Sequence, residues 1–103
     1  MGSILQDGLS LIIPAYNEEE NVEAVVKDAD HVFKTYFKPY QIIVVNDGST
    51  DRTGDVAEAL SVEVPVLKVV HHTVNKGLGE ALKTGYRHAD FEYISFVPAD
   101  GQI

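Results

Sequence analysis

The stretch Ile42-Ile43-Val44-Val45-Asn46-Asp47-Gly48-Ser49 (IIVVNDGS, 42–49) changes from a continuous apolar run to a polar turn. Four consecutive β-branched side chains are typical of a strand buried on both faces, as strands of parallel sheets are. Asp47-Gly48 is a common turn pair. The stretch therefore predicts an inner strand of a parallel sheet, with Asp47 at its carboxyl end.

Strand-like and amphipathic segments alternate on both sides of this stretch. The expected strands are 9–13, 42–45, 66–70 and 91–97, and the expected helices are 18–37, 51–60 and 78–89. Pro14 is expected to end the first strand, and Asn17 to cap the first helix. The third helix is expected to bury a stripe of Leu78, Ala81, Leu82, Gly85, Tyr86 and Ala89. The order β-α-β-α-β-α-β with right-handed crossovers predicts an α/β fold, a Rossmann-like three-layer α/β/α arrangement around a parallel sheet.

Composition excludes several classes of function. The 103 residues fit one domain, spanning 1–103, and carry 16 acidic against 8 basic residues, a formal net charge of −8. That balance argues against nucleic-acid binding, which needs clustered Lys and Arg. The absence of cysteine excludes disulfides and Cys-ligated zinc. Apolar runs are far shorter than the roughly 20 residues that span a bilayer, and no signal peptide is visible, so we expect a cytoplasmic protein.

Polar residues and turn formers follow every expected strand. In open parallel sheets, ligands bind beyond the carboxyl ends of the strands. The candidate site residues at that edge are Pro14, Ala15, Tyr16, Asn17 and Glu18 after the first strand, Asp47, Gly48 and Ser49 after the second, Asn75, Lys76 and Gly77 after the third, and Ala99, Asp100 and Gln102 after the fourth. Several also have a simpler interpretation: Asp47 could only stabilise a turn, Glu18 could be an acidic residue in the first turn of a helix, and Lys76 could be a solvated cation.

The residue types at this edge suit a nucleotide carried with a metal. The phosphate-binding patterns GxxxxGK[ST] and GxGxxG are absent. Carboxylates accept hydrogen bonds from a base or a ribose, and an aromatic ring such as Tyr16 can stack on a base. A carboxylate can also hold a hard cation that binds phosphate oxygens. The adjacent His71 and His72 are not expected to share a metal, because neighbouring strand residues point to opposite faces.

Four motifs occur in one order: IIPAYNEEENV (12–22), IIVVNDGSTDRT (42–53), NKGLGEALKTGY (75–86) and VPADGQ (97–102). With them the chain, from about residue 9 to 102, resembles family-2 glycosyltransferases of the GT-A fold, including polyprenyl-phosphate sugar synthases of the dolichol-phosphate mannose synthase type. The resemblance implies that 14–18 line a nucleotide pocket, that Asp47 contacts the base and that 75–77 close over the nucleotide. It also implies that Asp100, with Gln102, holds Mg²⁺ or Mn²⁺ on the diphosphate.

The same resemblance implies an activity: inverting transfer of a sugar from a UDP- or GDP-linked donor to a lipid-phosphate or saccharide acceptor. Members often carry a first acid where this chain has Pro98, which leaves any contact of that acid unassigned. Their catalytic domain is about twice this length, so we expect the chain to be its nucleotide-binding half. The carboxylate base is then expected beyond Ile103, and the fragment alone is expected to be inactive.

Three further expectations follow. The full-length protein is expected at the inner face of a membrane if its acceptor is a lipid. The chain is expected to form a homodimer, because a last strand without a neighbour leaves an unpaired edge. The alternatives are a non-catalytic nucleotide-sugar-binding module and a flavodoxin-like or receiver domain, although the latter would place an acid cluster where Tyr16-Asn17 stands.

Overall fold

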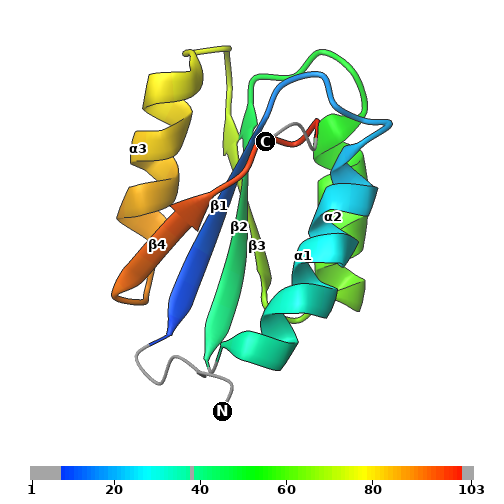
Figure 1. Ribbon diagram of the computed structural model, residues 1–103. Coiled ribbons are helices and arrows are strands. Elements are labelled where there is room, and N and C mark those ends of the chain that lie inside the picture. Colours follow the sequence, from blue (N-terminus) through cyan, green and yellow to red (C-terminus); the bar gives the residue numbers. More distant parts are fainter. Residues whose placement is uncertain (1–7, 38, 101–103) are drawn as a thin grey trace.

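The computed structural model describes residues 8–37 and 39–100, in which strands and helices alternate as the sequence predicts (Figure 1). The elements are β1 (Leu9–Ala15), α1 (Val22–Tyr36), β2 (Tyr40–Asp47), α2 (Thr53–Glu63), β3 (Leu67–His72), α3 (Leu78–His88) and β4 (Tyr93–Phe96). The strands form one parallel sheet in the order β3-β2-β1-β4. Helices α1 and α2 cover one face and α3 covers the other, which confirms the three-layer architecture.

The two inner strands bury side chains on both faces. Ile13 and Val44 pack with α1 and α2, whereas Ile12, Ile43 and Val45 pack under α3. All five are at most 2% exposed. The β-branched run in β2 therefore belongs to an inner strand, and the core consists of two apolar layers separated by the sheet.

Strand β1 continues through Pro14 to Ala15, so the prediction that Pro14 ends it is wrong. Proline lacks the N–H that a ladder needs, but β4 has already ended at Phe96, which pairs with Ile12. The carbonyl of Pro14 faces the segment after β4 and accepts a hydrogen bond from the Ala99 N–H at 3.3 Å. Proline is tolerated here because residue 14 lies beyond the last paired residue of β4 and contacts that side through its carbonyl, which needs no N–H.

Helix α3 lies on the sheet through small residues, which corrects the predicted apolar stripe. Ala81 is 1% exposed, whereas Leu78 and Tyr86 are 63% and 66% exposed. A Cβ added at Gly85 would lie 2.4 Å from Cγ2 of Ile12. This close approach of helix and sheet leaves Leu78 and Tyr86 on the exposed flank of the helix, whereas Leu82 is partly buried and packs against the core.

Strand β4 lies at one edge of the sheet and pairs with β1 over four residues. Its Phe96 side chain is 61% exposed. None of the helices in the described part of the chain has the length and apolarity required to cross a membrane.

Candidate functional site

The loops that follow the strands meet along one edge of the sheet, because all four strands are parallel (Figure 1). The segment after β4 is joined to the end of β1 by the Ala99–Pro14 hydrogen bond. The loop after β1 is joined to the loop after β2 by the Asn17 N–H, which donates to Oγ of Ser49 at 3.0 Å. The four segments that carry the predicted site residues are thus neighbours in a single row.

Asn17 connects two of these loops and does not cap a helix. Its φ is +53°, in the left-handed region that Asn tolerates better than most residues. Its Oδ1 accepts hydrogen bonds from the backbone N–H of Thr50 at 2.8 Å and of Asp51 at 3.3 Å. Helix α1 begins later, at Val22, with Asn21 in the N-cap position, so the predicted capping role of Asn17 is wrong.

A second set of hydrogen bonds reinforces this connection. Oγ1 of Thr53 accepts from the Glu18 N–H at 2.7 Å, and Oδ2 of Asp51 accepts from the Glu19 N–H at 3.2 Å. Partial burial opposes ionisation of Asp51, but the hydrogen bonds from Thr53 and Glu19 outweigh it and lower the pKa of the carboxyl. The carboxylate of Glu18 accepts from the side chain of Asn21 at 2.9 Å.

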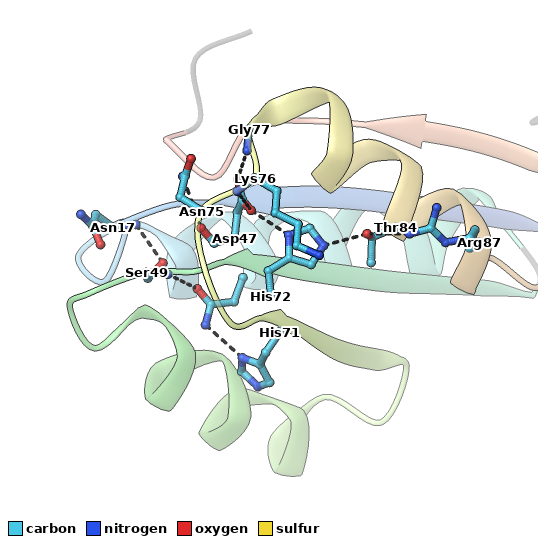
Figure 2. Close-up of polar contacts among 11 residues, drawn as sticks. Asn17, Asp47, Ser49, His71, His72, Asn75, Lys76, Gly77, Thr84 and Arg87 are labelled. Atoms are coloured by element: carbon cyan, nitrogen blue, oxygen red, sulfur yellow. Dashed lines mark hydrogen bonds and ion pairs between the residues drawn. The ribbon is translucent and has the colours of Figure 1, made fainter.

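Asp47 holds the loop after β3 against the end of β2 (Figure 2). One carboxylate oxygen, Oδ1, accepts from the Lys76 N–H and the other, Oδ2, from the Gly77 N–H, both at 2.9 Å. The Asn75 side chain donates to the backbone carbonyl of Asp47 at 3.3 Å. Nδ1 of His72 lies 2.7 Å from Oδ1. Asp47 is therefore part of the scaffold that positions residues 75–77.

The charge of Asp47 is stabilised inside the protein. The residue is 4% exposed, and this burial alone would raise the pKa of its carboxyl. The hydrogen bonds from His72, Lys76 and Gly77 outweigh burial and lower the pKa below its usual value. Asp47 is thus an ionised acceptor at neutral pH.

Gly48 lets the same loop approach the turn after β2. Its φ is +70°, and an added Cβ would lie 2.2 Å from the carbonyl carbon of Val74 and 2.3 Å from the backbone N of Asn75. No side chain fits there, so the turn requires glycine for its backbone angle and for its contact with residues 74–75.

The remaining predicted residues lie along the same edge. Tyr16 is 45% exposed, whereas Ala15 and Ala99 are each 2% exposed and so reach a ligand mainly through their backbone. Asp100 is exposed in the turn after β4, and Gln102 lies outside the described residues. Within residues 8–37 and 39–100, no group of three His, Cys, Asp or Glu side chains is arranged to hold a metal ion.

Sequence reasoning missed the role of the two histidines. They do face opposite sides of the sheet: Nε2 of His71 lies 2.6 Å from a carboxylate oxygen of Glu58, on α2, and Nε2 of His72 lies 2.7 Å from Oγ1 of Thr84, on α3. The register that pairs Asp47 with His72 is the signal that reveals the contact between these two side chains. It becomes visible only when β2 and β3 are known to be neighbours.

The chain matches the glycosyl transferase family 2 domain over residues 10–103. The chain belongs to this family. It is 39% identical over 94 residues to a dolichol-phosphate mannosyltransferase of Pyrococcus furiosus, an alignment that covers 91% of this chain and 26% of that enzyme. The chain thus spans about a quarter of the length of this relative.

Solved structures of glycosyltransferases with the GT-A fold share its architecture. A mannosyltransferase from Pyrobaculum calidifontis, in complex with GDP-Man and Mn²⁺, superimposes with a TM-score of 0.76 at 29% identity, over 89% of this chain and 27% of that one. Glucosyl-3-phosphoglycerate synthase from Mycobacterium tuberculosis, in complex with Mn²⁺, UDP and glucosyl-3-phosphoglycerate, superimposes with a TM-score of 0.72 at 26% identity. The superposition covers 90% of this chain and 33% of that one.

Proposed function

We propose that this chain is the donor-binding part of a glycosyltransferase and takes a UDP- or GDP-linked sugar together with Mg²⁺ or Mn²⁺. The observation that carries the proposal is the row of four loops at one edge of the sheet, in which hydrogen bonds join each loop to its neighbour. Similar structures that contain GDP-Man or UDP with Mn²⁺ support this ligand class.

Tyr16 and the loop 75–77 are proposed to enclose the nucleoside. The exposed Tyr16 ring offers a stacking surface, and the exposed Lys76 side chain offers a cation to phosphate. An ionised carboxylate has about four acceptor positions, and three of those of Asp47 are used within the chain. The fourth is proposed to accept an N–H of the base, with Pro14, Asn17, Glu18, Gly48 and Ser49 shaping the pocket around it.

Asp100 and Gln102 are proposed to hold the metal. A carboxylate and an amide oxygen are ligands that Mg²⁺ and Mn²⁺ prefer, and the diphosphate would supply further oxygens. When bound, the cation would stabilise negative charge on the departing diphosphate. A metal cation or local donors would also have to offset the acidic residues of a chain whose formal net charge is −8.

A thermal-shift and calorimetric titration tests this proposal. GDP and UDP are each added with MnCl₂, with MgCl₂ or with EDTA, and one nucleotide is expected to stabilise the protein only when metal is present. Asp100→Asn is expected to abolish the metal-dependent stabilisation by nucleotide. Asp28→Asn, which changes an exposed acid on α1, is expected to retain it. If neither nucleotide stabilises the protein with either metal, the proposal is wrong.

The acceptor and the stereochemistry belong to the same proposal. We propose inverting transfer to a lipid phosphate at the cytoplasmic face of a membrane, with a saccharide as the other acceptor class, and with the catalytic base in a part of the protein beyond residue 103. The named activity of the Pyrococcus furiosus relative, a dolichol-phosphate mannosyltransferase, supports the lipid acceptor. A transfer assay with the longer gene product and a short polyprenyl phosphate tests it. Nucleotide binding without transfer to any acceptor would favour a non-catalytic binding module.

We also propose that this 103-residue chain forms a homodimer through β4. The strand has β1 on one side, and beside it a groove of about 410 Å³ runs between α1 and β4, lined by Leu11, Val25, Asp28, Ala29, Val32, Phe33, Ser95, Phe96 and Val97. Light scattering is expected to give a dimeric mass, and Phe96→Asp is expected to give a monomer. A monomeric mass for the unaltered chain at high concentration would rule the dimer out.

A further inference from the structure

Four side chains form a continuous row of hydrogen bonds from α3 to the end of β2 (Figure 2). Nη2 of Arg87 donates to Oγ1 of Thr84 at 3.2 Å. The same Oγ1 lies 2.7 Å from Nε2 of His72, whose Nδ1 lies 2.7 Å from Oδ1 of Asp47. The row begins at a cation on the helix and ends at the carboxylate that holds residues 75–77.

The chemistry of the two end groups sets the direction of the bonds at both ends of the row. Ionised Asp47 only accepts, so Nδ1 of His72 carries a proton and donates it. The Arg87 guanidinium only donates, so the Thr84 oxygen accepts from it, and the hydroxyl proton of Thr84 can be donated to Nε2. All groups are then satisfied with a neutral imidazole in the Nδ1–H tautomer, which is the less common form of free histidine in water.

The row has the order of a carboxylate–imidazole–hydroxyl triad, but the structure rules out a nucleophilic role. Thr84 is 5% exposed and lies on the face of α3 that packs on the sheet. Its oxygen already accepts from Arg87, which withdraws electron density from the hydroxyl. Because no substrate reaches this oxygen, the row acts on the position of Asp47.

We propose that His72 is a positioning residue for the nucleotide edge: by donating to Oδ1 of Asp47, it keeps the carboxylate turned so that each oxygen receives one of the N–H groups of Lys76 and Gly77. The terminal torsion of Asp is soft, so two backbone donors alone define its rotation poorly. A third donor, itself held by Thr84, defines it. The positioning of Asp47 does not depend on the proposed function. Only the consequence for binding rests on it, namely that the loop 75–77 is already ordered when a nucleotide binds.

Two substitutions at one position separate positioning from packing. The side-chain nitrogen of Asn in His72→Asn occupies roughly the place of Nδ1, whereas that of Gln in His72→Gln occupies roughly the place of Nε2. The Asn variant therefore retains a donor to Asp47 and loses the contact with Thr84, and the Gln variant does the opposite. A role in packing alone predicts the reverse order, because Gln is the closer match to His in size.

Amide hydrogen exchange at Lys76 and Gly77 measures the effect without any nucleotide. His72→Gln is expected to accelerate exchange at both amides about tenfold, as loss of a hydrogen bond to a charged group does, and His72→Asn by no more than about twofold. His71→Gln, which changes the neighbouring residue on the opposite face, is expected to leave both rates unchanged. Equal rates in His72→Gln and His72→Asn, or slower exchange in His72→Gln, would overturn the proposal.

Nitrogen NMR of the imidazole supplies a second test that needs no variant. The unaltered protein is expected to show the Nδ1–H tautomer for His72 at neutral pH, and the Nε2–H tautomer would overturn the proposal even if a variant failed to fold.

Titrations with GDP and UDP in the presence of MnCl₂ complete the experiment. The dissociation constant of the nucleotide that binds is expected to rise about tenfold in His72→Gln and to change little in His72→Asn. If the unaltered chain binds neither nucleotide, the proposed function is wrong, whereas amide exchange and the tautomer still decide the positioning role.

Discussion

The turn after β2 allows a quantitative test of how the site is held. In Gly48→Ala the new Cβ would lie 2.2 Å from the carbonyl carbon of Val74, which is about 1.2 Å shorter than an ordinary van der Waals contact. The residue also keeps a φ of +70°, which costs a side chain at least about 1 kcal/mol. The segment 74–77 must withdraw to relieve the contact.

That withdrawal breaks hydrogen bonds of known length. The bonds from Lys76 and Gly77 to Asp47 are 2.9 Å long, so a shift of about 1 Å takes both beyond hydrogen-bonding distance. Each bond to a charged acceptor contributes roughly 1.5–3 kcal/mol. With the cost of the backbone angle, Gly48→Ala is expected to lower the free energy of unfolding by about 4 kcal/mol.

Gly79→Ala is the matched control. An added Cβ at Gly79, in the first turn of α3, meets no heavy atom within 4 Å. Its expected effect is a gain of about 0.5–1 kcal/mol, because alanine favours the helix. Urea unfolding at pH 7, followed by circular dichroism, compares the two variants. If Gly48→Ala unfolds within about 1 kcal/mol of Gly79→Ala, the account of this turn is wrong.

Two further predictions concern pH. Because the folded state lowers the pKa of Asp47 and Asp51 below the usual 3.8, the unfolded chain takes up protons first as the solution is acidified. The stability that these groups contribute is present above pH 3.8 and is lost as pH falls through their folded pKa values. In Asp47→Asn, the urea midpoint of unfolding is therefore expected to fall less steeply between neutral and acidic pH than in the unaltered protein. The same dependence on pH in both proteins would contradict this. At the alkaline end, burial and the hydrogen bond to Asp30 raise the pKa of Tyr40 from 10.0 to about 12. The unfolded state then loses the phenol proton first, so stability is expected to fall from pH 10 towards 12, and less so in Tyr40→Phe. The ultraviolet titration of the unaltered protein should show a late phenol that is missing in Tyr40→Phe.

Much of the fold could be predicted because it depends on local patterns. The β-branched run 42–45 indicates an inner strand, and the alternation of strands with amphipathic helices indicates a parallel sheet. Parallel strands have their carboxyl ends at one edge, so the row of candidate site residues follows from element order alone.

The errors occurred where a residue's partner is distant in sequence. Asn17 has the chemistry of a helix cap, yet its side chain bonds to Thr50 and Asp51 in the next loop. Leu78 and Tyr86 fit an apolar stripe, yet Gly85 brings α3 so close to the sheet that both remain exposed. Local periodicity cannot reveal which neighbour competes for a donor or how closely two elements approach.

The amino-acid sequence by itself determined the order of the elements, the two-sided burial of the inner strands and the edge at which ligands are expected, because each depends on side-chain type and spacing along the chain. Only the tertiary structure decided how that edge is organised. The register of β2 on β3 brings Asp47 beside His72, and α3 brings Thr84 to the other ring nitrogen. Hydrogen bonds depend on distances of a few tenths of an ångström, and those distances exist only once the strands and helices have packed.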